Sequence, residues 1–250
     1  MGRFEARTAV ITGGSSGIGL ASAKRLAEEG AHVFIIGRRD AEVKRAVEAI
    51  GGDRATGVVG DVSRPSALER LYEAVRAQGR SIDVLVANAA VASFVSLEET
   101  TEEHLDDIFG VNVRGMVFTV QKALPLLADD ASVILVGSTA ADRGVEAFGA
   151  YAASKAAVRS LARTWSTELA PRGIRVNVVS PAWIETPGGM AAFGDEQAAR
   201  AMKEQVAATV TKGRMGSPEE AAAVVAFLAS TESSYVVGAN LYVDGGANQV

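Results

Sequence analysis

The chain has 250 residues, of which 48% are hydrophobic and 22% are charged, a composition typical of soluble globular proteins. Its 25 basic and 30 acidic residues give a net charge of −5, which excludes a dedicated nucleic-acid-binding protein. The absence of cysteine excludes disulfides and zinc–cysteine sites, so we expect no metal site and a reducing, cytoplasmic location. No run approaches the ~18 apolar residues of a membrane helix, so we expect no membrane contact.

Short runs rich in valine and isoleucine alternate with longer amphipathic stretches along the chain. The runs are continuously apolar, as strands are when helices cover both faces of a parallel sheet. We expect strands at residues 9–11, 33–36, 56–59, 84–87, 133–136, 176–179 and 241–243, and helices at residues 18–29, 41–50, 66–78, 101–127, 151–169 and 218–229. The alternation predicts an α/β fold with a doubly wound parallel seven-stranded sheet (a Rossmann fold) and one domain over residues 1–250.

One long stretch without strand character covers residues 185–215. Its glycines flank a weak helical pattern at residues 196–207. Because it follows a strand of an α/β sheet, we expect it to form a lid over a substrate. The alternative is a solvated excursion with no role.

A glycine-rich turn follows the first strand, and the chain as a whole has 26 glycines, more than is usual for its length. Glycine lets a turn be tight and lets backbone approach a ligand closely. The following helix offers free N–H groups and a positive dipole end to a phosphate. We therefore predict a dinucleotide-binding turn made of Gly13, Ser15, Ser16, Gly17, Ile18 and Gly19.

The end of the second strand indicates which dinucleotide binds. In NAD-binding folds a carboxylate here binds the ribose 2′-hydroxyl, but this chain has Gly37 followed by Arg38 and Arg39. The arginine fork of donors matches a phosphate. We predict NADP(H) rather than NAD(H), with Arg38 as the first contact and Arg39 as the second. Asp40 is the alternative carboxylate for NAD, but we expect it to cap the next helix.

Three residues form a candidate catalytic group. Tyr151 and Lys155 are four apart on one helical face, and Ser138 follows the strand at 133–136. Carbonyl reduction needs a hydride at carbon and a proton at oxygen, and a tyrosine with its ordinary pKa of ~10 is a poor base at neutral pH. A nearby lysine cation, together with the charge of the nicotinamide, lowers that pKa. We predict Tyr151 as general acid/base, with Ser138 holding the substrate oxygen.

Further motifs follow the third and fourth strands, lie in the fourth helix and close the chain. They are Asp61-Val62, Asn88-Ala89-Ala90, Val111-Asn112-Val113 and Tyr242-Val243-Asp244-Gly245-Gly246. With the glycine turn and the Tyr151–Lys155 pair, they make the chain resemble the short-chain dehydrogenase/reductase family over its whole length. The resemblance is to the single-domain branch of about this size.

The resemblance implies a catalytic tetrad of Asn112, Ser138, Tyr151 and Lys155. It implies that Asn112 holds a water linking Lys155 to solvent, and that Lys155 also binds the nicotinamide ribose beside Tyr151. Further cofactor contacts are implied at Asp61, Val62, Asn88, Ala89, Pro181, Ala182, Ile184 and Thr186.

Two residues depart from the family pattern. Ala90 and Ala182 stand where relatives usually have glycine. If the backbone φ there is negative, alanine fits at little cost, whereas a positive φ would impose strain. We interpret both as tuning of the pocket.

The substrate pocket is expected to be mainly apolar, with no arginine or lysine placed to bind a substrate anion. Its predicted residues are Ser93, Phe94, Ala140, Phe148, Trp183, Met190 and Phe193. By resemblance, we predict an enzyme that acts on CH–OH donors with NAD(P) and interconverts a hydrophobic ketone and its secondary alcohol.

Other functions stay open at this stage. They are a 3-oxoacyl-(acyl carrier protein) or acyl-CoA reductase, a sugar or steroid dehydrogenase, and a cofactor-sensing protein without turnover. Relatives that reduce acyl carrier substrates usually have basic residues before the fifth strand, where this chain has Asp129 and Asp130. Like charges weaken docking of an acidic carrier, so we favour a free small-molecule ketone.

The fourth and fifth helices have apolar faces that one sheet does not need to bury. The residues are Met116, Phe118, Val120, Val158, Leu161 and Trp165. By resemblance we expect these helices to pair between subunits of a homotetramer. The alternative is that these faces belong to the core.

Overall fold

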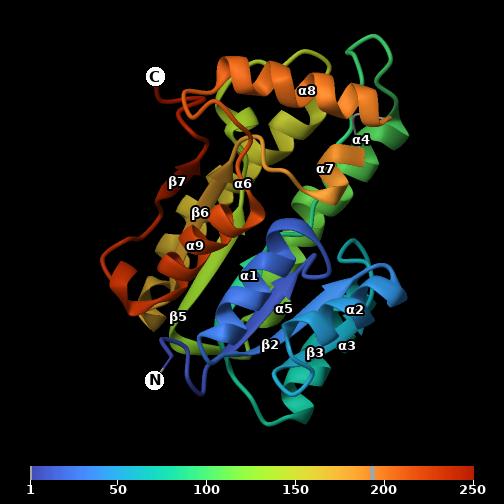
Figure 1. Ribbon diagram of the computed structural model, residues 1–250. Coiled ribbons are helices and arrows are strands. Elements are labelled where there is room, and N and C mark those ends of the chain that lie inside the picture. Colours follow the sequence, from blue (N-terminus) through green and yellow to red (C-terminus); the bar gives the residue numbers. More distant parts are fainter. Residues whose placement is uncertain (1, 192–194) are drawn as a thin grey trace.

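The computed structural model describes residues 2–191 and 195–250, which form a central sheet between two layers of helices (Figure 1). Seven parallel strands in this part of the chain are hydrogen-bonded in the order β3-β2-β1-β4-β5-β6-β7. They are β1 (Thr8–Thr12), β2 (His32–Gly37), β3 (Ala55–Val59), β4 (Ile82–Ala87), β5 (Leu127–Val136), β6 (Arg175–Pro181) and β7 (Asn240–Val243). The order reverses between β1 and β4, where ligands bind in doubly wound sheets.

Two sets of helices cover the two faces of the sheet. Helices α1 (Gly17–Glu28), α2 (Asp40–Ile50) and α9 (Pro218–Ala229) cover one face, and α3 (Pro65–Ala77), α5 (Met116–Ala123) and α6 (Gly149–Leu169) cover the other. Successive residues of β1 pack into opposite layers: Ala9 and Ile11 contact the first set, and Val10 contacts the second. Both faces of each central strand are therefore buried, which explains the continuous runs of valine and isoleucine. The predicted fold class is confirmed.

The helix predicted at residues 101–127 is wrong as a single element. The chain forms α4 (Glu102–Phe109), then a π-helical turn (Gly110–Gly115), then α5, and Leu127 already belongs to β5. The wider turn lies between two glycines and contains Asn112, whose side chain is fully buried. Single π turns inside helices are frequently found at functional sites.

Three residues expected on a helix-pairing surface belong to the core instead. Met116, Val120 and Val158 are buried against the sheet, because α5 and α6 cover the face that β4, β5 and β6 present. Phe118 and Trp165 are half-buried and pack against the same core. The exposed apolar surface available for subunit pairing on these helices is therefore smaller than the sequence indicated.

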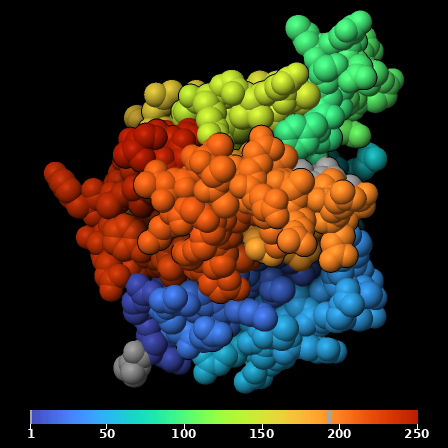
Figure 2. Space-filling model, turned by 45° about the horizontal axis from the view of Figure 1, so that its top comes forward, coloured from blue at the N-terminus to red at the C-terminus, as the bar shows by residue number. Residues whose placement is uncertain are grey.

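The described residues of the stretch at 185–215 lie across one face of the molecule, with the N-terminal part (blue) below them and residues from the middle of the chain (green) above them (Figure 2). Its described residues form α7 (Pro187–Ala191) and α8 (Glu196–Thr209), the latter at the place predicted for a weak helix. Its two ends are tied together, because Gly216 donates from its N–H to Trp183 and accepts at its carbonyl oxygen from Glu185, both at 2.9 Å. A closed base makes the stretch a compact excursion from the sheet, which leaves the lid a prediction.

No helix in the described part of the chain is both long and apolar enough to cross a membrane.

Candidate active site

A cavity of about 530 Å³ opens at the carboxyl edge of the parallel sheet. We call the part at the glycine turn (residues 12–19) and the end of β2 the cofactor end, and the part at residues 90–94 and 138–151 the substrate end. Most residues predicted for the site line this one cavity. They are Gly13, Ser15, Ser16, Gly17, Ile18, Arg38, Arg39, Asp61, Val62, Asn88, Ala89, Phe94, Ala140, Ser138, Phe148, Tyr151, Lys155, Pro181, Ala182, Trp183, Ile184 and Thr186.

The glycine turn fits a dinucleotide phosphate because its glycine positions have no side chain to block the backbone from a ligand. Gly13 and Gly17 have φ values of 65° and 53°, which other residues rarely adopt. Gly19 lies behind the turn rather than on the cavity wall, and a Cβ there would collide with the carbonyl oxygen of Gly13. Asn88 fixes the turn from β4, because its Nδ2 donates to the carbonyl of Thr12 at 2.9 Å. The backbone at the amino end of α1 thus stays open to an anion.

The end of β2 has no room for the usual ribose-binding carboxylate. A Cβ on Gly37 would lie 2.6 Å from Oγ of Ser15. Arg38 is exposed, lines the cavity and has no ion-pair partner among the described residues. Arg39 also lines the cavity, but its guanidinium is 2.6 Å from Glu42. Arg38 is therefore the better placed of the two arginines to meet a 2′-phosphate.

Glu42 is a cavity residue that the sequence interpretation missed. Its carboxylate lines the cofactor end, where the buried Oε2 atom lies 2.6 Å from the guanidinium of Arg39. The spacing of three residues from Arg39 on one helical face was a signal that could have revealed the pair. The expectation that Asp40 caps α2 is wrong: Asp40 is the first residue of the helix, and its carboxylate pairs with Lys44 at 2.8 Å.

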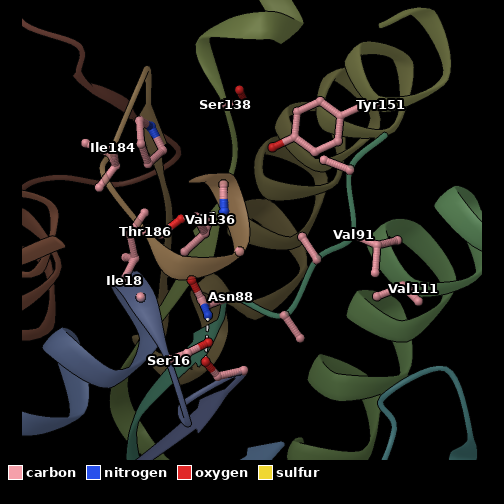
Figure 3. A pocket seen from close by; sticks show the side chains of 18 of the residues that line it. Ser16, Ile18, Asn88, Val91, Val111, Val136, Ser138, Tyr151, Ile184 and Thr186 are labelled. Carbon is pink, nitrogen blue, oxygen red and sulfur yellow. Dashed lines mark hydrogen bonds between the residues drawn. The ribbon is translucent and has the colours of Figure 1, made fainter. Parts of the chain in front are cut away.

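The predicted catalytic residues meet at the substrate end. Ser138 follows β5, and Tyr151 and Lys155 lie near the start of α6. The hydroxyl of Tyr151 points toward Ser138 (Figure 3). Lys155 is 1% exposed, donates from Nζ to the carbonyl of Val136 at 2.9 Å, and lies 5.6 Å from the centroid of the Tyr151 ring. Two hydroxyl groups can therefore reach one substrate oxygen, with a cation behind them.

Burial sets the protonation of this group. It raises the pKa of Tyr151, and the hydrogen bond with Ser138 opposes that rise. Burial also lowers the pKa of Lys155 to about 8. The sequence predicted that Lys155 lowers the pKa of Tyr151, but the protein groups alone do not produce that result. Desolvation is the larger effect on Tyr151, and the ammonium of Lys155 bonds to the carbonyl of Val136.

Asn112 lies behind the cavity rather than on its wall. Its Oδ1 accepts from the N–H of Val91 at 2.9 Å, and its Nδ2 donates to the carbonyl of Val91 at 2.9 Å and to Oγ of Ser154 at 3.1 Å. Ser154 in turn donates to the carbonyl of Tyr151 at 2.7 Å. These contacts tie the loop after β4 to α6. The water relay at Asn112 stays a prediction.

The whole chain is similar to known oxidoreductases. The sequence model of the family described as enoyl-(acyl carrier protein) reductase matches residues 13–248. The oxidoreductase asL5 of Sarocladium schorii is 45% identical over 250 residues, which cover 99% of this chain and 98% of that protein. A crystal structure named short-chain dehydrogenase/reductase SDR, glucose/ribitol dehydrogenase, from Brucella melitensis has a TM-score of 0.93 at 30% identity, covering 100% and 99% of the two chains.

This chain belongs to the short-chain dehydrogenase/reductase family. A second solved structure, levodione reductase, has a TM-score of 0.89 at 32% identity and covers 97% of this chain and 98% of its own. Membership makes the chain an oxidoreductase that acts on CH–OH donors with a nicotinamide cofactor, NAD(P).

Aromatic rings form the inner wall of the substrate end. Phe148 stacks on the ring of Tyr151 with 4.4 Å between centroids, and Phe94 stacks on Phe148 at 4.4 Å. Ala140 and Trp183 line the same space. The wall is apolar, as the family resemblance and the sequence suggested.

Two predicted pocket residues lie away from this wall, and the position of a third is not described. Oγ of Ser93 faces His104 at 3.4 Å instead of the cavity, because the loop turns toward α4. Met190 packs against the cluster of Val206, Val210 and Met215 beneath α8. Phe193 lies outside the described residues.

Arg143 is a second cavity residue that the sequence interpretation missed. It is exposed and lines the substrate end together with Val145. The sequence offered only a weak signal, namely its position between Ser138 and Tyr151. The expectation that no arginine is placed for a substrate anion is therefore wrong.

The two family departures cause no backbone strain. Positive φ values at non-glycine residues occur, within the described chain, at Ala6, Asp130 and Ala147 and not at Ala90 or Ala182. Both alanines line the cavity in conformations that suit them.

Proposed function

We propose that this family member is an NADP(H)-dependent oxidoreductase that interconverts a hydrophobic ketone and its secondary alcohol. The observation that carries the proposal is that Ser138 and Tyr151 line the same cavity as the glycine turn, with the Tyr151 hydroxyl pointing toward Ser138. That arrangement puts a proton donor beside the place where a nicotinamide ring would lie, with its phosphates at the turn.

The protein residues then have distinct tasks. Ser138 donates a hydrogen bond to the substrate oxygen, and Tyr151 gives that oxygen a proton in reduction or removes one in oxidation. Lys155 supplies a positive charge behind Tyr151. Its ammonium would reach the nicotinamide ribose by turning away from the carbonyl of Val136. A bound nicotinamide would supply or accept the hydride. The aromatic wall at Phe148 keeps water away from the reacting carbon.

The preference for NADP(H) rests on Arg38. It is the unpaired cation at the cofactor end, and the Ser15–Gly37 contact excludes a carboxylate from the end of β2. Glu42 holds the charge of Arg39, so a single arginine fork carries the preference. We therefore expect NADPH to bind better than NADH, with a modest ratio.

A 3-oxoacyl thioester is the second candidate substrate, because the matching family model has an acyl carrier protein in its description. The structure weakens the argument that acidic residues would repel an acyl carrier protein. Asp129 and Asp130 lie at the amino end of β5, whereas the cavity lies at the carboxyl end, and Arg172 pairs with Asp129 at 3.1 Å. The apolar wall still favours a free ketone.

The test is a panel of substrates assayed with both cofactors. It should contain aryl and alkyl ketones, a cyclic diketone, a sugar lactol with its aldehyde form, and acetoacetyl-CoA. We expect kcat/KM to be highest for an apolar ketone with NADPH. Equal or better use of NADH would contradict the cofactor assignment, and activity confined to the thioester would replace the substrate assignment.

The assembly and location are further parts of the proposal. Phe118, Leu161 and Trp165 remain partly exposed on α5 and α6, which supports pairing of these helices in a homotetramer. Light scattering that gives a monomer mass would contradict it. The lack of cysteine supports a cytoplasmic location.

A further inference from the structure

Arg143 gives the substrate end a positive charge that the proposed reaction does not use. It is exposed, lines the cavity and has no hydrogen-bond or ion-pair partner among the described residues. The described lining residues with carboxylates, Glu42 and Asp61, are both at the cofactor end. Lys155 is buried and bonded to Val136. The guanidinium is thus the uncompensated charge at the mouth of the substrate end.

The acidic neighbours of Arg143 in the sequence do not neutralise it. The carboxylate of Asp142 accepts a hydrogen bond from the hydroxyl of Tyr242 at 2.9 Å. Glu146 is exposed, does not line the cavity, and makes no ion pair within the described residues. The positive charge therefore stays available to a ligand.

The backbone around Arg143 fixes where its side chain begins. The segment from Ser138 to Tyr151 forms a wall of the cavity, and its outer part is bonded to the loop after β4, because the N–H of Val95 donates to the carbonyl of Ala147 at 2.7 Å. Ala147 has a φ of 57°, a left-handed conformation that tertiary contacts have to hold. A wall pinned in this way fixes the backbone from which the Arg143 side chain extends.

Followed back along the chain from Tyr151, the lining residues of this wall are first reactive, then apolar, then charged. Tyr151 carries the reacting hydroxyl, Phe148 and Val145 add apolar surface, and Arg143 is exposed. A molecule that follows the wall would have a carbonyl at one end and an apolar stem in the middle. Its other end would meet a guanidinium.

We propose that the substrate is a ketone with a carboxylate at the far end of an apolar stem, and that Arg143 binds this carboxylate at the cavity mouth. The inference rests on the proposed function and names its substrate class. A carboxylate suits this position because its two oxygens accept the two parallel N–H donors of one arginine fork. The carboxylate selects and orients the ketone, and the reacting atoms stay with Ser138 and Tyr151.

The expected effect is moderate because Arg143 is exposed. Water and salt screen a charge pair at the mouth of a cavity, so the gain in kcat/KM is on the order of tenfold rather than thousandfold. The same screening predicts that the gain shrinks as ionic strength rises. An apolar contact would not respond to salt in this way.

The experiment compares ω-carboxyalkyl phenyl ketones of increasing stem length with their neutral methyl esters. The measured quantity is the ratio of kcat/KM for acid to ester, with NADPH, in the full-length protein. We expect the wild-type ratio to exceed one at the best stem length. Arg143→Gln should lower it about tenfold, and Arg143→Lys should retain part of it. Arg163→Gln, which removes an exposed arginine of α6 outside the cavity, should leave it unchanged.

A ratio that is the same in the wild type, Arg143→Gln and Arg163→Gln would overturn the inference while leaving ketone reduction intact. If neither acids nor esters are reduced, the proposed function fails instead. A binding measurement then decides the inference separately. Calorimetry with 5-phenylpentanoate and its amide should show that the wild type prefers the acid and that Arg143→Gln loses this preference; equal binding of both would refute the carboxylate site.

Discussion

The two ends of the cavity are built from different parts of the protein. The cofactor end is mainly backbone, shaped by glycines that are close in sequence and followed directly by the amino end of α1. The substrate end is mainly side chains, which come from the loop after β4, the segment 138–151 and the residues after β6. A Cβ added at the glycine turn therefore disturbs the cofactor end through the backbone, whereas a substitution at the substrate end alters one side-chain contact at a time.

Tyr151→Phe should have the largest effect, and that effect should be confined to the substrate end. Loss of the proton donor should lower kcat for ketone reduction about a thousandfold. NADPH binding, which depends on the glycine turn and Arg38, should be largely retained. Steady-state kinetics and a fluorescence titration of NADPH measure the two effects. Tyr235→Phe is the control, because Tyr235 is fully exposed; unchanged turnover in Tyr151→Phe would overturn the mechanism.

Gly19→Ala should weaken cofactor binding and leave the substrate end intact. The added Cβ collides with the Gly13 carbonyl, so the turn has to move, and cofactor affinity should fall about a hundredfold. The contact between Ser138 and Tyr151 lies at the other end and should persist. Calorimetric titration of NADPH gives the affinity. Gly52→Ala is the matched control, because nothing lies within 4 Å of a Cβ there; equal affinities for both variants would contradict the close-approach argument.

The pH dependence of ketone reduction should follow the protonation of Lys155. Burial lowers the pKa of Lys155 to about 8, so its charge is present below that pH and is lost above it. The pKa of Tyr151 is raised, so the tyrosine stays protonated over the same range. We expect kcat/KM for reduction to be level below pH 8 and to fall by up to tenfold per unit above it. A profile that rises through pH 8 would contradict this assignment.

Two substitutions at the cofactor end should have smaller and opposite effects on cofactor choice. Arg38→Gln should weaken NADPH binding about tenfold relative to NADH, because a 2′-phosphate loses its charged partner. Glu42→Gln should strengthen NADPH binding a few-fold, because it releases Arg39 from its ion pair. Dissociation constants for both cofactors test this, with Glu48→Gln on the same helix as control. Weaker NADH binding in Glu42→Gln would show that Glu42 binds the ribose instead.

The cofactor end was the more predictable of the two because its signals are local. Gly13, Gly17 and Gly19 occur within seven residues, and the strand before them and the helix after them are evident from hydrophobic pattern alone. Tyr151 and Lys155 were equally accessible, since a spacing of four puts them on one helical face. Ser138 was found because it directly follows a strand.

The substrate end was predicted less well because its residues meet only after folding. Ser93 and Met190 lie near the cavity in the chain but pack toward α4 and α8. Arg143 has no periodic or motif signal that distinguishes it from other exposed arginines. The π turn at Asn112 was also missed, because an amphipathic pattern does not show where buried hydrogen bonds widen a helix.

The sequence by itself determined the parallel sheet, the family, the glycine turn and the Ser138–Tyr151–Lys155 group, because each depends on short-range spacing or on uninterrupted hydrophobicity. Only the tertiary structure decided that Met116 and Val158 are core residues, that Glu42 neutralises Arg39, and that Arg143 reaches the substrate end. Those outcomes depend on which segments share a volume, and the packing of the whole chain settles that.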